Sequence, residues 1–332
     1  MADFRRFMTA WVCAIILGTI LTAGTLRILN LTSKEIGQSH KPIEDSNHFS
    51  VQWMGFSPTD YSNLYPDYYI CINDLAESTL TMQIALQILN QEAYGYYFLI
   101  EQNSAPPAGW TISTFYIGYI DVDETLTFVY SDIERTKPGS ISGGVLTESV
   151  DLVAKAYWDS SYTNLYSQDN FAVTFNFIDR TAAVWNQLYN SDFDDASVQG
   201  WSHIGSGNLI VSSTYYRSFQ YSLRLYSNDV WGAAYRKSFD VTGPYAEAYL
   251  IFSLRSTNWE YPVSGYGITP RISFDGTTYF RPDVIPSTDK WYQFIIPIPV
   301  GTSTQVDIYA VCRDDTAFKH YAYLDDVFLI AK

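Results

Sequence analysis

The chain has 332 residues, of which 47% are apolar, so it is long enough for two folded units and too hydrophobic to be disordered. Aromatic residues make up 17% of the chain, with 28 Tyr, and this composition favours β-sheets over helix bundles. The formal net charge of −15 argues against binding to nucleic acid, because broad phosphate contact requires a basic face. With only three Cys and four His, zinc or thiol chemistry is also disfavoured.

The charge divides the chain into three blocks. Residues 1–30 hold three Arg and one Asp, for a net charge of +2. Residues 31–189 hold 6 basic and 19 acidic groups, for −13, and residues 190–332 hold 11 basic and 15 acidic groups, for −4. We expect these blocks to differ in environment as well as in charge.

The first block, residues 1–30, is predicted to be a membrane anchor or a signal segment. No charged residue occurs between Phe7 and Leu26, and a helix of that length spans a bilayer core of about 30 Å at about 1.5 Å per residue. Arg5 and Arg6 precede it and place the N-terminus in the cytoplasm. We therefore expect a single-pass protein of the cell membrane, with the residues after about 30 extracellular.

Cleavage as a signal peptide is the alternative, because small residues occur at Thr22–Gly24. The apolar stretch is long for a signal peptide, which favours an uncleaved signal anchor. Residues 31–48 show no periodicity and are rich in turn-forming residues, which is typical of a linker.

Residues 49–180 are predicted to form an antiparallel β-sandwich. Apolar and polar residues alternate over 80–88, 126–130, 150–156 and 171–177, and turn-forming clusters separate these segments. Strand number and length resemble an immunoglobulin-like domain, although no motif specific to that family is present. The acidic stretch Asp121–Glu124 is interpreted as a solvated turn between two strands rather than as a catalytic carboxylate pair.

Residues 190–332 also alternate, and here four short motifs occur in a fixed order. The motifs are Asn190–Asp194 followed by Gly200–Trp201, then Tyr221–Leu225, Asp289–Phe294 and Tyr323–Leu329. In sequence and order they resemble the galactose-binding-like jelly rolls of carbohydrate-binding modules. The resemblance implies a closed sandwich of about eight strands. The fold class expected for the whole chain is thus mainly β, with an N-terminal transmembrane helix, two antiparallel sandwiches and a jelly roll as the second.

The same resemblance implies a structural Ca²⁺. Members of this family hold the ion between an opening acidic residue, carbonyls of a turn and a closing acidic residue, which here correspond to Asp194 and Asp325. Carbonyls near Ser218 and Ser222 would complete an oxygen shell of the kind calcium requires. Gln220 stands where the family usually has Gly, which puts one carbonyl in doubt. The alternative is that Asp194 caps a turn and Asp325 faces solvent.

Sugar binding would need exposed aromatic rings beside polar groups, because ring faces stack on the apolar faces of pyranoses. The candidate ligand residues lie in segments rich in aromatics and turns: Trp231, Trp259, Tyr261, Tyr266, Tyr279 and Arg281. A composition this aromatic also exposes some rings by chance. Trp201 and Trp291 are predicted to be packing residues instead.

Three functions remain open on these grounds. A membrane-anchored surface protein that binds a glycan is the first, and a self-associating subunit of a surface layer, pilus or fibre is the second. An enzyme is disfavoured, because the sequence shows no nucleophile–base pair, no cluster of His and no phosphate-binding loop. Cys71 and Cys312 could pair outside the cell, but their apolar neighbours favour two buried free thiols.

Overall fold

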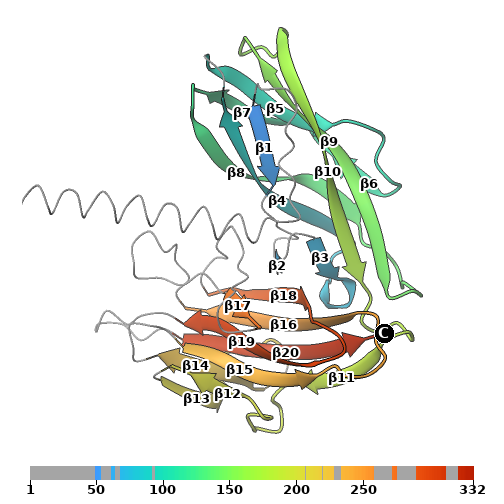
Figure 1. Ribbon diagram of the computed structural model, residues 1–332, viewed down its shortest axis with the longest axis vertical. Helices are drawn as coiled ribbons and strands as arrows, with labels where there is room; N and C mark the ends of the chain where they lie inside the picture. Colours follow the sequence, from blue (N-terminus) through green and yellow to red (C-terminus); the bar gives the residue numbers. More distant parts are fainter. Residues whose placement is uncertain are drawn as a thin grey trace, which may run out of the picture. The chain divides into compact units, whose positions relative to one another are not determined.

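The computed structural model describes residues 49–53, 61–63, 68–91, 94–205, 207–218, 220–227, 233–257, 271–274, 289–311 and 321–332. The regular secondary structure of these residues is almost entirely β-strand, and the helix among them is a short 3-10 turn, η1 (Ile72–Asp74). The expectation of a mainly β protein is confirmed. Figure 1 shows these strands gathered in sheets.

The N-terminal sandwich is built from two sheets. Its four-stranded sheet has the order β1-β4-β8-β6, and its five-stranded sheet has the order β3-β10-β9-β5-β7. The strands of the first are β1 (Phe49–Trp53), β4 (Thr79–Asn90), β8 (Thr125–Thr136) and β6 (Trp110–Ile112). Those of the second are β3 (Tyr68–Cys71), β10 (Leu165–Ile178), β9 (Val145–Tyr157), β5 (Tyr96–Gln102) and β7 (Phe115–Ile120).

The C-terminal sandwich also has two sheets. Its seven-stranded sheet has the order β13-β14-β20-β16-β18-β2, with β11 also on β20, and its four-stranded sheet has the order β12-β15-β19-β17. The larger contains β13 (Gly207–Ser212), β14 (Ser222–Ser227), β20 (Tyr321–Ala331), β16 (Ala248–Ser256), β18 (Trp291–Pro297), β2 (Tyr61–Asn63) and β11 (Asn186–Ser191). The smaller contains β12 (Ser202–Ile204), β15 (Ala233–Asp240), β19 (Ser303–Val311) and β17 (Arg271–Ser273).

Alternation along the strands explains both cores, because every second side chain of a strand points to the same face. In β4 the apolar members of the alternation, from Leu80 to Ile88, are buried. In the C-terminal sandwich Phe252 and Phe294 stack with their ring centroids 5.3 Å apart. Of the two tryptophans predicted to pack, Trp201 is buried and Trp291 is half-buried.

The two sandwiches share one strand order. The order β1-β4-β8-β6 corresponds strand by strand to β12-β15-β19-β17, with antiparallel pairing throughout. Likewise β9-β5-β7 corresponds to β20-β16-β18, and β10 is an added strand between β3 and β9. In an immunoglobulin sandwich some consecutive strands share a sheet, whereas from β3 to β9 every connection changes sheet. The immunoglobulin-like expectation for 49–180 is therefore corrected to a jelly-roll order.

The predictions for the Asp121–Glu124 segment and for the cysteines can be compared with the structure. Asp121–Glu124 forms a tight turn in which the Glu124 N–H donates to the Asp121 carbonyl at 3.2 Å, as expected. Cys71 is buried, as predicted, and its Sγ donates to Asn73 Oδ1 at 3.5 Å. Cys312 lies outside the described residues, so the prediction that the two cysteines do not pair stays a prediction. Residues 1–48, with the predicted membrane helix and linker, also lie outside them. Within the part of the chain that the structure describes, none of the helical segments has the length and hydrophobicity needed to cross a bilayer.

Candidate functional site

The six predicted ligand residues all fall on parts of the chain that the structure does not describe. They are Trp231, Trp259, Tyr261, Tyr266, Tyr279 and Arg281. Their role stays a prediction. Described strands beside these segments in the chain belong to the four-stranded C-terminal sheet, whose outer face is the one turned away from the core.

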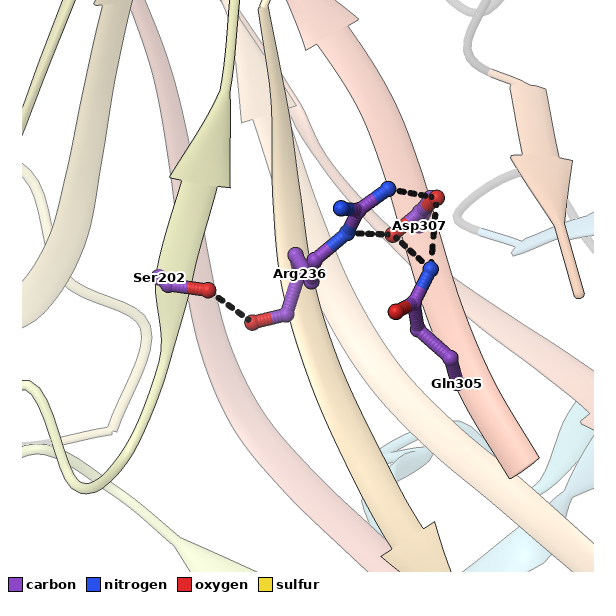
Figure 2. A network of polar contacts seen from close by, with 4 residues as sticks. All are labelled: Ser202, Arg236, Gln305 and Asp307. Atoms are coloured by element: carbon purple, nitrogen blue, oxygen red, sulfur yellow. Dashed lines mark hydrogen bonds and ion pairs between the residues drawn. The ribbon is translucent and has the colours of Figure 1, made fainter. Parts of the chain in front are cut away.

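A row of polar residues crosses this outer face from edge to edge. Ser202 of β12 pairs with Arg236 of β15, Arg236 pairs with Asp307 of β19, and Asp307 pairs with Ser273 of β17. Because residues in register on neighbouring strands point to the same side of a sheet, these four side chains share one face. We call them the polar row. Figure 2 shows three of them together with Gln305.

An ion pair forms the centre of the polar row. Arg236 donates from Nε to Asp307 Oδ1 and from Nη2 to Asp307 Oδ2, both at 2.7 Å (Figure 2). The side chain of Asp307 is 1% exposed and that of Arg236 is 35% exposed. The hydrogen bond to Asp307 raises the pKa of Arg236 above its usual value. The carboxylate is thus a buried anchor that fixes a partly exposed guanidinium in one orientation.

Neighbouring groups extend the polar row into a patch. Gln305, two residues before Asp307 and on the same face of β19, donates from Nε2 to both carboxylate oxygens at 3.4 and 3.3 Å. The Ser202 hydroxyl donates to the Arg236 carbonyl at 3.3 Å. Tyr309, two residues beyond Asp307 on the same face, is half-buried and adds an aromatic ring. The patch therefore combines fixed donors and acceptors with one ring, a combination that can bind polyhydroxylated molecules.

The sequence pattern indicates the positions of Arg236 and Asp307, although the two residues belong to no motif. Alternation in β15 and β19 gives Arg236 and Asp307 the outward positions between buried residues such as Tyr235 and Val306. Only the cross-strand register, however, brings the two together.

The predicted calcium residues do converge on one turn. Asp194 Oδ1 accepts the Gln220 N–H at 3.1 Å, and Asp325 Oδ2 accepts the Arg217 N–H at 2.7 Å. The turn predicted to offer carbonyls thus directs N–H groups towards both carboxylates. Asp325 does not face solvent, since it is fully buried. Asp194 is half-buried and bonds a turn, as in the capping alternative.

Burial dominates the electrostatics of Asp325 and raises its pKa to about 7, with the neighbouring Asp326 adding to the effect. Hydrogen bonds from the backbone at Arg217, Asp326 and Ser218 act in the opposite direction. A carboxylate oxygen accepts more than one contact, so these bonds leave lone pairs for a cation. Burial makes the negative charge of Asp325 costly, and a bound cation would offset that cost. Asp325 therefore fits a calcium ligand, although the Ca²⁺ assignment stays a prediction. Among the described residues, no three His, Cys, Asp or Glu side chains are grouped for metal binding.

Similarity to known proteins is confined to solved structures. No protein-family model matches the chain, and no curated protein matches it. Among solved structures, the CBM22-1 xylan-binding domain of Xyn10C from Paenibacillus barcinonensis is 16% identical, with a TM-score of 0.32 over 46% of this chain and 97% of that domain.

The CBM22-1–CBM22-2 tandem of the same protein covers 88% of this chain and 100% of the tandem, at 11% identity and a TM-score of 0.32. TmCBM61, solved with β-1,4-galactotriose, is 15% identical, with a TM-score of 0.30 over 42% of this chain and 94% of that module. These three structural neighbours are all carbohydrate-binding modules.

Proposed function

We propose that the chain is a non-catalytic, membrane-anchored extracellular protein whose C-terminal jelly roll binds carbohydrate on the outer face of its four-stranded sheet. One observation carries this proposal. Arg236 is oriented by the buried carboxylate of Asp307 and remains 35% exposed, whereas Asp307 and Ser273 on the same face are buried. A guanidinium held in this way offers its remaining N–H groups at fixed angles, so little conformational entropy is lost when a sugar hydroxyl accepts them.

The predicted aromatic residues stand next to strands of this sheet in the sequence, which supports the proposal that they belong to the same site. Trp231 lies just before β15, and Trp259, Tyr261 and Tyr266 lie in the segment that leads into β17. The first residues of both strands pair near the end of β19, Ala233 with Val311 and Arg271 with Tyr309. Both segments therefore join the sheet at one end of the patch. Rings supplied there would cover the apolar face of a pyranose while the polar row binds its hydroxyls.

The anchor and the ion complete the proposal. The uncharged stretch from Phe7 to Leu26 would hold the protein in the cell membrane with the sandwiches outside. A Ca²⁺ between Asp194 and Asp325 would fix the turn that both carboxylates contact.

Affinity electrophoresis of the full-length chain in mild detergent tests the binding. Gels would contain xylan, β-1,4-galactan or hydroxyethylcellulose, and the variants would be Arg236→Gln and Asp307→Asn. We expect retardation of the wild-type chain by at least one polymer and at least a tenfold weaker interaction for both variants. The matched control is Arg255→Gln, which removes an ion pair with Asp289 on the other sheet. Binding unaffected by Arg236→Gln would refute this site.

The second function, a self-associating surface subunit, predicts a different result. In that case the wild-type chain migrates normally in all three gels. It also sediments as concentration-dependent oligomers.

A further inference from the structure

A cluster of tyrosines on the N-terminal sandwich belongs to neither the polar row nor the calcium turn. It consists of five residues on the outer side of the five-stranded sheet, which we call the tyrosine platform: Tyr97, Tyr116, Tyr119, Tyr157 and Tyr162. This sheet is not the counterpart of the one that carries Arg236. The counterpart is the four-stranded N-terminal sheet, because β15 corresponds to β4.

Strand register assembles the platform. Tyr119 of β7 pairs with Tyr97 of β5, and Tyr97 pairs with Tyr157 of β9. The three rings therefore form one cross-strand row with neighbours about 4.8 Å apart along the sheet. Tyr116 lies on the same strand as Tyr119, beyond a bulge at Gly118 that changes the register by one residue.

Tyr162, in the turn between β9 and β10, packs its ring against three rings of the platform. Its ring contacts those of Tyr116, Tyr157 and Tyr97 edge-on, at centroid distances of 5.0, 5.6 and 6.2 Å. It adopts a φ of 55°, a conformation that costs free energy for a residue with a side chain.

The turn around Tyr162 supports that conformation. Asp159 accepts backbone N–H groups from Ser161, Thr163 and Asn164 at 3.0, 3.2 and 2.8 Å. A hydrogen bond from the Ser161 hydroxyl, together with the backbone bonds from Asn164 and Thr163, lowers the pKa of Asp159, so it remains an acceptor near neutral pH. The platform is thus built before any ligand arrives, which reduces the entropy lost on binding.

Two rings of the platform, Tyr116 and Tyr119, are open to solvent, whereas Tyr97 and Tyr162 are half-buried and Tyr157 is buried. Tyr116 is 62% exposed and Tyr119 is 54% exposed, values that place them among the most exposed large side chains described. A second pair of exposed rings, Tyr94 at 62% and Trp158 at 50%, lies 5.9 Å apart by centroids beside the start of β5 and the end of β9. Rings gathered in this way on a surface mark a binding site more often than rings scattered singly do.

Charge and polarity select the ligand. On this face Lys155 and Glu101 neutralise each other in an ion pair. The exposed Asp151, six residues before Tyr157 on the same side of β9, accepts a hydrogen bond from Ser104 Oγ at 2.7 Å. Gln168, exposed on β10 in register with Lys155, adds a neutral amide. Residues 31–189 carry −13, which disfavours an anionic polymer, and the platform itself offers no carboxylate to attract a cation. Phenol rings with hydroxyls at their rims, bordered by an amide, match a molecule with apolar faces and hydroxyl edges.

We propose that the tyrosine platform is a second carbohydrate site, which binds a neutral saccharide chain by stacking on Tyr116 and Tyr119. It belongs to the other sandwich and uses different residue types from the C-terminal site, and so does not depend on it. With both sites on one chain, a polysaccharide long enough to reach both is held more tightly than by either alone.

The test compares substitutions at the two sites in the full-length chain. The platform variant is Tyr116→Ala with Tyr119→Ala, and the C-terminal variant is Arg236→Gln. Because the two tyrosines are more than half exposed, their removal is expected to leave the fold intact, and an unchanged circular dichroism melting curve checks this. Retardation is measured in gels with xylan, β-1,4-galactan and hydroxyethylcellulose. Tyr216→Ala, which removes a Tyr that is 48% exposed on the C-terminal sandwich, is the control.

We expect at least a fivefold loss of affinity for a neutral polymer in the platform variant, and no loss in the Tyr216→Ala control. The paired variant Tyr116→Phe with Tyr119→Phe keeps the rings and should retain most of the binding. If the platform variant binds like the wild-type chain and Arg236→Gln alone abolishes binding, the platform inference is overturned and the C-terminal site stands. If the reverse holds, the C-terminal site fails and the platform stands. Failure of all three polymers to retard the wild-type chain overturns the platform inference.

Discussion

Asp194 and Asp325 are bound to the same turn: Gln220 donates its N–H to Asp194 at 3.1 Å and Arg217 donates its N–H to Asp325 at 2.7 Å. Asp194 follows β11, and Asp325 belongs to β20, the last strand of the C-terminal sandwich. The turn thereby links the segment after β11 to β20. Two carboxylates at one turn are also a place where a cation would relieve charge.

Calcium is expected to stabilise the protein through this turn. At pH 7.5 the melting temperature of the full-length chain should be several degrees higher in 1 mM Ca²⁺ than in chelator, an effect of about 1–3 kcal/mol for tight binding. Asp325→Asn should abolish the difference. Asp289→Asn, at a carboxylate whose side chain is 58% exposed, is the matched control and should respond as the wild-type chain does. Equal melting temperatures with and without Ca²⁺ would remove the calcium site.

Without calcium, stability is expected to fall as the pH rises towards 7. The pKa of Asp325 is about 7 in the folded protein, mainly because of burial, and about 3.9 in an unfolded chain. Between these values the folded state holds the proton and the unfolded state does not, so the free energy of unfolding decreases with pH by up to about 1.4 kcal/mol per unit.

Urea titrations in chelator between pH 4 and pH 8 would measure this slope. It should level off above pH 7, where both states are ionised, and it should be largely absent in Asp325→Asn. A wild-type chain as stable at pH 7 as at pH 5, relative to Asp325→Asn, would contradict the prediction.

In the N-terminal sandwich, Glu148 should contribute to stability through a partly buried ion pair with Arg135. It accepts hydrogen bonds from Arg135 Nε at 2.8 Å and Trp110 Nε1 at 2.7 Å. Burial alone would raise the pKa of Glu148, but the hydrogen bonds outweigh burial and lower it. The ion pair therefore stabilises the fold near neutral pH, and this stabilisation is lost as the pH falls through the pKa of Glu148 in the folded protein. Glu148→Gln should cost about 2–3 kcal/mol at pH 7, because it leaves Arg135 without its counter-charge.

The control for this prediction is Glu134→Gln, at an exposed position of β8, which should change stability by less than about 0.5 kcal/mol. Urea unfolding measures both. If the two variants have the same midpoint, the ion pair contributes nothing net.

Gly144 should tolerate no side chain. It is buried with a φ of 77°, and an added Cβ would overlap the indole of Trp185. Its carbonyl also accepts the Asp179 N–H at 2.9 Å, which ties it to the end of β10. Gly144→Ala should therefore cost at least about 2 kcal/mol, measured as the shift in urea midpoint. Gly139→Ala meets nothing within 4 Å and should be nearly neutral.

The strands were predictable from sequence, and their arrangement was not. Alternation from Leu80 to Ile88 predicted β4 because one face of the strand is buried, which is a property of the segment alone. Which strands share a sheet depends on pairing between distant segments. That is why the N-terminal sandwich was expected to be immunoglobulin-like and has the jelly-roll order instead.

In the candidate sites, too, some residues are predictable from the sequence and others become neighbours only through strand pairing. Asp194 and Asp325 were predicted as partners of one turn because family motifs fixed both positions, and both do contact it. Arg236 and Asp307 form no motif, since they become neighbours only through the register of β15 and β19. The tyrosine platform could not be predicted from the sequence either, because Tyr119, Tyr97 and Tyr157 become neighbours only by pairing across three strands.

The shared strand order has a consequence for how the chain reaches its native state. Two halves with equivalent strands can exchange them during folding, a typical misassembly of repeated domains. In the described residues β10 has no counterpart in the C-terminal half: it separates β3 from β9, whereas β14 pairs with β20 directly. A strand from the wrong half would therefore meet different neighbours, since β9 is flanked by β10 whereas β20 is flanked by β14, and the two sheets are not interchangeable.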